Sequence, residues 1–437
     1  MHLNGPAQSE HGYLVSKPQA WFAFVLSFLL MTFDFIDRQI VVSMFPYLKA
    51  EWSLSDRELG ALVSIVSVVI AVSSLPLSLL VDRWSRVKGV VVMATVWSLA
   101  TIACAFAGSF QRLFTARAFI GLGEAGYGPA AGAILSSVFP TRMRATIIGG
   151  FLAAASFGSV LGVVLGGVIA ARWGWKAAFG IVGVPGLVLA GLYMFVRDYQ
   201  APELATNGPT GLMKARGIAR ELFRARSGVA AYFAGAMQLI TTSTILAWLP
   251  SFFNRVYGVP ADRSGIWAAG VIVCATLGVV FWAGVADRLV LRNVRLRMLT
   301  PAACCLATFG IFAVAFGALN PGALQSGMIV LGAFVMTATT GPIPAVAVDV
   351  VHPALRATAG SMVAVVQNLF GLGVGPLVSG ALSDALGLQT AMAIVAISCG
   401  LAALLLAVGS RSYPADRAAA ANHKIHIETL DAVPQTA

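Results

Sequence analysis

Five charged residues lie inside stretches of the sequence that are otherwise apolar: Asp34, Asp37, Arg38, Arg117 and Glu124. A charged side chain at the centre of a membrane-spanning helix raises the free energy of insertion by about 2.5–3.5 kcal/mol. Because five such residues would be very unfavourable on a lipid-facing surface, we expect them to face one another or a water-filled cavity. Carboxyl groups there can take up and release protons, and a guanidinium can hold an anion through two parallel hydrogen bonds.

The spacing of these residues places them on shared helix faces. Asp34, Asp37 and Arg38 lie three or four positions apart, and Arg117 and Glu124 are two helical turns apart. We expect Glu124, which lies among glycines in mid-span, to carry a coupling proton, with Asp37 as a second carrier and Asp34 as its substitute. Arg117, the deepest arginine, is expected to anchor an anionic group. The alternative is an ion-pair network that only fixes helix packing.

In the second half of the chain, the centres of the predicted spans contain neutral polar residues and no charged residue. We expect Gln238, Thr241, Thr337, Gln367 and Asn368 to contribute to substrate binding. Hydrogen bonding between helices would use the same side chains, and both roles remain open. The five cysteines and five histidines form no cluster with metal-ligand spacing, so neither a metal nor another cofactor is expected.

The chain as a whole has the composition of a membrane protein. Of its 437 residues, 58% are hydrophobic and 11% are charged, whereas soluble domains carry roughly 25% charged residues. Apolar runs of about 20 residues, which cross a bilayer as a helix, recur from Trp21 to Val408. The sequence therefore predicts an all-α membrane protein with twelve transmembrane helices, at residues 20–47, 56–80, 89–109, 112–138, 145–171, 176–196, 228–253, 264–286, 297–318, 325–348, 358–383 and 388–409.

One long joint divides these helices into two sets of six. We expect an N-terminal tail at 1–19, a six-helix bundle at 20–196, a linker at 197–227, a second six-helix bundle at 228–409 and a C-terminal tail at 410–437. Within the linker, Leu212 to Arg226 has the spacing of an amphipathic helix on the membrane surface. The polar tail from Arg411 onward is expected to be disordered.

Basic residues are distributed unevenly between the two sides of the predicted membrane. Of the 29 Lys and Arg residues, 20 fall in joints or tails on one side and seven on the other. Basic residues accumulate on the cytoplasmic side of membrane proteins, so both termini and the linker are predicted to be cytoplasmic. This distribution accounts for the net charge of +11 without nucleic-acid binding. We expect a monomer in a bacterial inner membrane.

Two short motifs recur in both halves. Asp-Arg ends the second and eighth spans, and Arg-Ala-Thr opens the fifth and eleventh. The segment Ser78 to Lys88 resembles the signature of the major facilitator superfamily. Repeated halves of six spans are typical of transporters whose substrate site lies between the halves. We expect a conformational latch that moves with this transition, formed by Asp82, Arg83, Arg86, Asp287 and Arg288.

Glycines recur at regular spacing within two predicted spans. The string Gly121-x-Gly123-x-x-Gly126 has the spacing of a dinucleotide-binding loop, but such a loop needs a preceding strand and opens a helix. Here the string lies inside an apolar span, so the glycines are expected to let neighbouring helices approach closely. The same is expected of Gly158 and Gly162 in the fifth span.

The first half also resembles the spinster family. The resemblance is carried by Asp37-Arg38, Asp82 to Arg86, Thr115 to Tyr127 and Trp173 to Phe179. It implies proton-linked transport of anionic amphiphiles such as lysophospholipids or sphingoid phosphates, with proton binding at Asp37 and Glu124. By the same resemblance Arg38 and Arg117 would hold the anionic head group, and Tyr127 is placed in the predicted substrate site.

Two other functions are compatible with these residues. A proton-coupled transporter of small organic anions, such as sugar acids, would use the same arginines on a carboxylate. A membrane sensor or scaffold would need neither five buried charges nor a duplicated six-span unit. No nucleophile–base pair is apparent, so an enzyme is not predicted. The predicted partners are a small-molecule or lipid substrate, protons and membrane lipids.

The predicted topology can be tested by thiol labelling. We expect a single cysteine introduced at Gly208, in a chain whose native cysteines are replaced, to react with a membrane-impermeant reagent only after cells are permeabilised. Reaction in intact cells would place the linker outside and overturn the topology.

Overall fold

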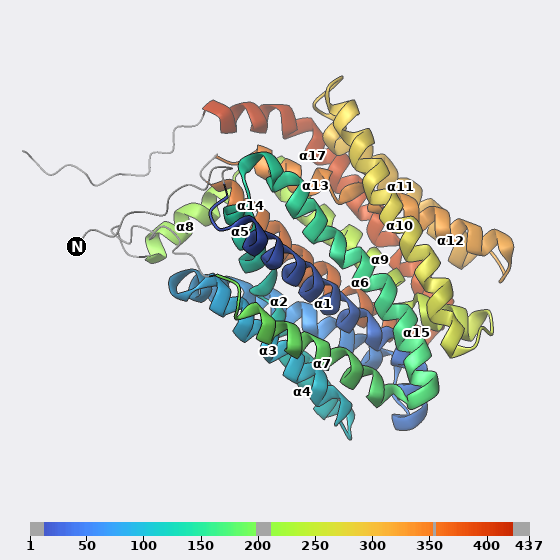
Figure 1. Cartoon of the computed structure of the whole chain (residues 1–437). Coiled ribbons are helices and arrows are strands. Elements are labelled where there is room, and N and C mark those ends of the chain that lie inside the picture. The colour runs from blue at the N-terminus through green and yellow to red at the C-terminus, as the bar shows by residue number, and fades with distance from the viewer. Residues whose placement is uncertain (1–12, 198–210, 353–354, 423–437) are drawn as a thin grey trace, which may run out of the picture.

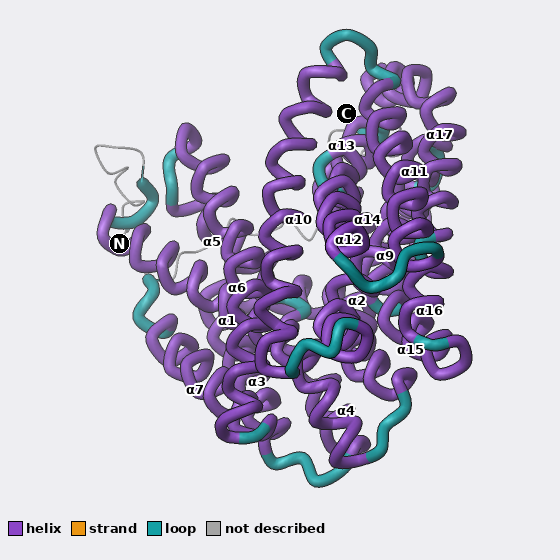
Figure 2. Tube along the Cα trace, turned by 90° about the vertical axis from the view of Figure 1, so that its right-hand side faces the viewer, coloured by secondary structure: helices purple, strands orange, loops and turns teal. Residues whose placement is uncertain are grey.

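Helices make up nearly all of the described chain. The computed structural model describes residues 13–197, 211–352 and 355–422, and for residues 78–79, 82–83, 211–216, 357 and 421–422 it describes the backbone alone. No strand occurs among these residues (Figure 2). Figure 1 shows the first-half helices, blue to green, gathered on one side and the second-half helices, yellow to red, on the other.

Each half contains helices long enough to span a bilayer. The first half comprises α1 (Lys17–Trp52), α2 (Asp56–Trp84), α3 (Arg86–Ala105), α4 (Phe110–Glu124), α5 (Tyr127–Val138), α6 (Arg144–Trp173) and α7 (Trp175–Tyr193). The second half comprises α9 (Arg226–Val256), α10 (Ala261–Val290), α11 (Leu296–Gly317), α12 (Ala323–Met336), α13 (Pro342–Asp349), α14 (Arg356–Val366), α15 (Gly375–Leu386), α16 (Leu388–Val395) and α17 (Ile397–Asn422). Helix α8 (Gly211–Leu222) lies between the halves in sequence.

The predicted twelve-span fold is confirmed. Eleven helices or joined helices of the described chain are long and apolar enough to cross a membrane. The twelfth span is the α4–α5 pair, which a turn at Ala125 and Gly126 divides into pieces of 15 and 12 residues. The repeated Arg-Ala-Thr motif begins a helix in both halves, at Arg144 in α6 and at Arg356 in α14.

Four spans change their helical geometry partway along, and the twelfth does so at a turn at Ala396, between α16 and α17. The fourth is broken after Glu124. The tenth passes through a short 3-10 turn, η2 (Thr337–Thr339), between α12 and α13. The eleventh contains a π-helical segment, η4 (Gln367–Leu372), between α14 and α15. Broken helices and π segments release backbone groups from regular hydrogen bonding and are frequent at functional sites of membrane proteins.

The C-terminal region differs from the prediction. The expected disorder from Arg411 onward is wrong as far as Asn422, because α17 continues as a helix to that residue. Tyr413 is fully buried, and its hydroxyl donates to Asp349 at 2.6 Å. Asp416 accepts hydrogen bonds from the backbone and hydroxyl of Ser227 at 2.9 and 2.6 Å. These contacts with earlier helices hold a polar segment in helical form.

The structure describes the second part of the predicted linker, from residue 211 onward. Of the amphipathic segment expected at Leu212 to Arg226, the part up to Leu222 is helical and belongs to α8, whereas Arg226 begins α9. The side chain of Leu222 is buried against Val351 and Ala359, so the end of α8 packs on the second half. The composition of Ala201 to Gly211, with two prolines, also predicts a flexible stretch; residues 201–210 of it lie outside the described residues, and Gly211 begins α8.

Glycines bring the backbones of α1 and α6 into contact, as predicted. A Cβ atom on Gly158 would lie 2.3 Å from the carbonyl oxygen of Thr32, and one on Gly162 would lie 2.7 Å from that of Ile36. No side chain larger than hydrogen fits at these positions without moving α1. Since α1 carries three of the five in-span charges, this contact fixes their position.

The two halves meet along two seams. Helix α2 packs against α15, and α6 packs against α10. A Cβ on Gly60 of α2 would lie 2.1 Å from the carbonyl oxygen of Pro376 in α15. On the other seam, a Cβ on Gly265 of α10 would lie 2.4 Å from the carbonyl oxygen of Val163 in α6. At both seams, the backbones of the two halves are therefore in direct contact.

A matched pair of glycine substitutions tests this packing. Gly158→Ala should lower the melting temperature of the purified protein by several degrees, because overpacking typically costs about 1–3 kcal/mol. Gly149→Ala in the same helix meets no atom within 4 Å, and should be neutral or slightly stabilising through its helix propensity. Equal melting temperatures for the two variants would contradict the proposed close contact of α1 and α6.

Candidate functional site

The five in-span charges form one buried cluster between α1 and α4. Asp37 and Arg117 are 1% exposed, Asp34 is 3% exposed and Glu124 is 6% exposed. Arg38 is the most accessible of the five, with 23% of its side chain exposed. The cluster expected from the sequence is thus assembled, and Arg38 is the member that solvent or a ligand can reach most easily.

Arg38 is the centre of this cluster. Its Nη2 lies 2.8 Å from Oε2 of Glu124, and its Nε lies 3.6 Å from Oδ1 of Asp34 on the preceding helical turn. The guanidinium also lies over the Phe35 ring, 5.1 Å from the ring centre. Glu124 therefore pairs with the arginine of α1, across a helix interface, rather than with Arg117 on its own helix.

Arg117 occupies a different environment. Its Nε donates to the carbonyl oxygen of Leu62 in α2 at 2.7 Å, while its Nη1 has no hydrogen-bond partner among the described residues. Arg117 and Asp37 are close enough for their opposite charges to attract each other. Both carboxyl oxygens of Asp37 lack a hydrogen-bond partner in the described part of the chain, and the nearby Thr101 hydroxyl donates instead to Trp97. The cluster thus has an ion-paired part around Arg38 and a part around Asp37 whose carboxyl oxygens have no hydrogen-bond partner among the described residues.

The charges of the cluster do not balance. When all five groups are ionised, three carboxylates face two guanidiniums, which leaves one net negative charge. One bound proton makes the cluster neutral. Unbalanced charge is unfavourable in a low-dielectric surrounding, so the arrangement is chemically suited to taking up a single proton.

Local packing explains why Glu124 lies at this position. It is the last residue of α4, where the span breaks. A Cβ on Gly123 would lie 2.6 Å from the backbone nitrogen of Trp97, and one on Gly126 would lie 2.5 Å from the side chain of Met93, both in α3. The predicted role of these glycines in close helix packing is confirmed. Because these glycines have no side chain, the broken span can lie directly against α3 at the level of the charged cluster.

Three of the residues predicted to bind substrate are used in helix–helix hydrogen bonds. The Tyr127 hydroxyl donates to the Ser27 carbonyl oxygen at 2.6 Å. The Gln238 side chain donates to the Met336 carbonyl oxygen at 2.7 Å and accepts from two cysteine thiols. Thr241 shares a hydrogen bond of 2.7 Å with Ser398. All three are at most 2% exposed, so in this conformation they are placed for packing.

The remaining three lie on the irregular segments of the second half. Thr337 begins the 3-10 turn, and its hydroxyl donates to the Phe334 carbonyl oxygen at 2.9 Å. Gln367 and Asn368 begin the π-helical segment and are half-buried. The Asn368 amide donates to the Ala364 carbonyl oxygen at 2.9 Å, which leaves its side-chain oxygen unassigned among the described contacts. These residues are more accessible than the first three.

The predicted latch is only partly described. The side chains of Asp82 and Arg83 lie outside the described residues. Arg86 is half-buried, and Asp287 and Arg288 near the end of α10 are exposed. The latch role of these residues remains a prediction.

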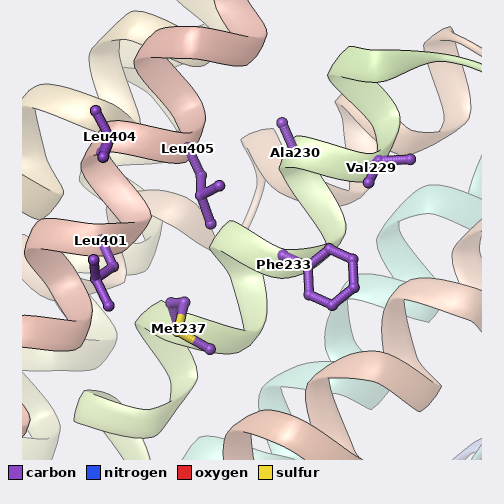
Figure 3. A pocket seen from close by; sticks show the side chains of 7 residues that line it. All are labelled: Val229, Ala230, Phe233, Met237, Leu401, Leu404 and Leu405. Carbon is purple, nitrogen blue, oxygen red and sulfur yellow. The ribbon is translucent and has the colours of Figure 1, made fainter.

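The pocket drawn in Figure 3 lies away from the charged cluster. It has a volume of about 350 Å³ between α9 and α17 and is lined by Val229, Ala230, Phe233, Met237, Leu401, Leu404 and Leu405. Its lining carries no polar side chain, so the pocket offers nothing to hold an anion or a proton. Within the described residues, no group of His, Cys, Asp and Glu side chains could hold a metal ion.

Two contributors to the cluster were not predicted. Phe35 supports the Arg38 guanidinium, and the Leu62 carbonyl oxygen of α2 holds Arg117. The position of Phe35 beside the in-span charges is visible in the sequence, although an aromatic residue in a span is usually a packing residue. A backbone carbonyl leaves no signal in the sequence at all.

The pairing of Arg38 with Glu124 can be tested by unfolding. Arg38→Gln should destabilise the protein by about 3–5 kcal/mol, because it leaves buried carboxylates without their cation. Adding Glu124→Gln should recover part of this loss, since one unpaired carboxylate is then removed. Melting temperatures of the wild type, both single variants and the double variant form the cycle. Strictly additive effects would show that the two side chains do not interact.

The sequence and the structure both match known transporters. Residues 27–373 match the Major Facilitator Superfamily. The chain is 28% identical over 424 residues to the gallate transporter of Pseudomonas putida, a match that covers 88% of this chain and 91% of the relative. It is 24% identical over 385 residues to the hexuronate transporter of Bacillus subtilis, covering 82% and 87%.

Among solved structures, a bacterial homologue of the human lysosomal transporter Spinster, in an inward-facing and unoccupied conformation, has the same fold. The TM-score is 0.81 at 22% sequence identity, and the superposition covers 92% of this chain and 99% of the other. The resemblance to spinster proteins seen in the sequence thus extends to the fold. Because the matched family region spans well over half of the chain, this protein belongs to the Major Facilitator Superfamily, a family of membrane transporters rather than enzymes.

Proposed function

We propose that this transporter couples the movement of small organic anions to protons by alternating access. The observation that carries the proposal is the arrangement around Arg38. This guanidinium is the most exposed member of the cluster, and the carboxylate of Glu124 holds it at 2.8 Å. It is therefore a cation that a substrate carboxylate can reach and whose present partner is itself a carboxylate.

Competition for Arg38 supplies a coupling mechanism. A substrate carboxylate that binds Arg38 weakens its ion pair with Glu124, and the nearby carboxyls of Asp34 and Glu124 then lack their cation. A proton bound to either carboxyl removes the excess negative charge. Anion binding and proton binding therefore favour each other, and by linkage the effect is reciprocal. This mechanism favours transport of proton and anion in the same direction.

The roles of the other charged residues follow from their burial. Asp37, with two unbonded oxygens among the described contacts, is proposed as a second proton carrier or relay. Arg117 is 1% exposed and is held by the Leu62 carbonyl oxygen, so we assign it to balancing Asp37 in this conformation. Direct contact of Arg117 with substrate then requires a conformation in which α2 has moved.

The relatives support small organic acids as the substrate class. Gallate and hexuronate, which the two relatives are named for, each combine one carboxylate with several hydroxyl groups. One accessible guanidinium suits the carboxylate. Thr337, Gln367 and Asn368 on the irregular segments of the second half offer neutral partners for hydroxyl groups. Anionic amphiphiles, which the spinster resemblance implies, would use the same arginine and remain the second candidate.

The remaining proposals concern the membrane location of the protein, its oligomeric state and its conformational latch. The uneven distribution of basic residues supports cytoplasmic termini and linker in a bacterial inner membrane. We further propose that the chain acts as a monomer and that Asp82, with the basic residues beside it, latches the cytoplasmic ends of the helices. The exposure of Asp287 and Arg288 fits a latch that is released in this conformation.

The coupling proposal is tested by replacing Glu124. In proteoliposomes, Glu124→Gln should abolish accumulation driven by an imposed pH gradient but still allow exchange of labelled substrate, because the amide keeps a hydrogen-bonding group yet cannot ionise. The substrates to compare are gallate, a hexuronate and a lysophospholipid. We expect the wild type to accumulate at least one of the two organic acids.

Glu221→Gln serves as the matched control. Glu221 lies in α8, where it pairs with Arg224 outside the cluster, and its loss should leave accumulation unchanged. If Glu124→Gln still accumulates substrate against its gradient, Glu124 is not the essential proton carrier and Asp37 becomes the leading candidate. Transport of the lysophospholipid without either acid would replace the proposed substrate class by the second one.

A further inference from the structure

The pocket between α9 and α17 opens on the outer surface of the second half. Its lining residues Phe233, Leu401 and Leu404 are exposed, and no polar side chain lies among the others (Figure 3). Helix α17 packs mainly on α9 and α11, which leaves its other side uncovered. Both helices belong to membrane spans, at Arg226–Val256 and Leu388–Ala420. Because an apolar surface on such helices faces hydrocarbon, the pocket is a groove that an acyl chain of the bilayer can fill.

An arginine of α9 lies at one end of this groove. Arg226 is the first residue of α9 and is exposed. Ala230, Phe233 and Met237 of the lining follow it by four, seven and eleven positions. At 3.6 residues per turn, these positions share one face of the helix. The Arg226 side chain therefore belongs to the same face as the groove, at the point where α9 begins.

Helix α17 places a second arginine at the same end. Arg411 is exposed and follows Leu404 by seven positions, which is two turns along the same face. A Cβ on Gly409 would lie 2.6 Å from the side chain of Ala230, so these two residues are opposite each other. From this contact, Arg411 is two residues towards the end of α17, and Arg226 is four residues towards the start of α9. At a rise of about 1.5 Å per residue, the two arginines differ in level by only about 3 Å.

No carboxylate neutralises these two arginines within the part of the chain that the structure describes. Asp416 also lies near the start of α9, but it accepts hydrogen bonds from the backbone and hydroxyl of Ser227. Ser227 is one position after Arg226 and so points about 100° away from it around the helix. The positive end of the α9 dipole adds to the two guanidiniums. The end of the groove therefore attracts an anion.

We propose that an anionic phospholipid binds at this site, with one acyl chain in the groove and its phosphate between Arg226 and Arg411. Guanidinium groups match phosphate oxygens in geometry as well as charge, and basic pockets between membrane helices recognise anionic head groups. A zwitterionic lipid carries its own cation, which the two arginines repel. The groove has a volume of about 350 Å³, which suits a single chain better than a whole lipid.

This lipid is a bound partner and not the transported substrate. All residues of the site belong to the second half, so a movement of one half relative to the other does not divide it. The site also lies apart from the buried charged cluster of the first half. The proposal therefore depends neither on the substrate class nor on proton coupling.

Lipid binding is measured by native mass spectrometry of the purified protein titrated with phosphatidylglycerol or phosphatidylcholine. The wild type should bind one phosphatidylglycerol more tightly than any phosphatidylcholine. Arg226→Gln and Arg411→Gln should each lower the affinity for phosphatidylglycerol roughly fivefold and leave that for phosphatidylcholine unchanged. Both side chains are exposed, so neither variant should disturb folding.

Arg142→Gln is the matched control. Arg142 is an exposed arginine in the joint between α5 and α6 of the first half, and its loss should not change the affinity for phosphatidylglycerol. A second control uses inorganic phosphate. It should not raise the melting temperature at concentrations where phosphatidylglycerol does, because binding needs the acyl chain as well as the phosphate. Equal stabilisation by both would show a phosphate site and overturn the lipid site.

A phosphatidylglycerol with a photoreactive diazirine in its acyl chain locates the site. Cross-links should fall mainly on the groove residues of α9 and α17, such as Phe233 and Leu401, and should decrease in Arg226→Gln. Cross-links spread evenly over the lipid-facing helices, or equal affinities for the two lipids, would show ordinary solvation by the bilayer and overturn the proposal. A dimer that excludes the lipid would instead assign the groove to a second copy of the chain.

Discussion

The energetic penalty of placing ionised groups inside a bilayer is the constraint on which this structure depends. Arg38 and Glu124 come from different helices, and their contact at 2.8 Å requires these two residues of α1 and α4 to lie at the same depth. The glycines of α6 that touch α1, and those around the end of α4 that touch α3, set this depth through backbone contacts. The apolar packing of the first half can therefore be understood as the support that keeps opposite charges together away from water.

The two halves meet this constraint in different ways. In the second half, the buried Gln238 side chain makes neutral hydrogen bonds with a carbonyl oxygen and two thiols, whereas the first half buries charged side chains. Its irregular segments then carry the more accessible polar groups. Under the proposed coupling, such a division would let the first half change its protonation while the second half keeps the same neutral contacts. The shared architecture of repeated halves thus supports unlike chemistry on its two sides.

Local properties could be predicted from the sequence and long-range ones could not. The apolar length of each span and the charges within it are visible along the chain, and both the spans and the burial of the five charges followed. The choice of Arg38 over Arg117 as the partner of Glu124 depends on where α1 lies relative to α4, which the spacing of residues along the chain does not encode. Asp56 pairs with Arg255, which is 199 residues away in the sequence, and its backbone N–H donates to Asp384, which is 328 residues away. Neither contact could be predicted from the sequence. Polar composition after Arg411 suggested disorder because the burial of Tyr413 depends on Asp349 in another helix.

The odd number of charges in the cluster has an electrical consequence. With its three carboxyls ionised, the first half holds one uncompensated negative charge inside the membrane field, whereas the form with one proton holds none. A membrane potential does work on a charge of about 2.3 kcal/mol per 100 mV if the charge crosses the whole field, and a proportionate share if access shifts across part of it. Under the proposed coupling, voltage would therefore act on the empty, deprotonated carrier itself, and the resting potential of the cell would bias which side of the membrane that form faces before any substrate has bound.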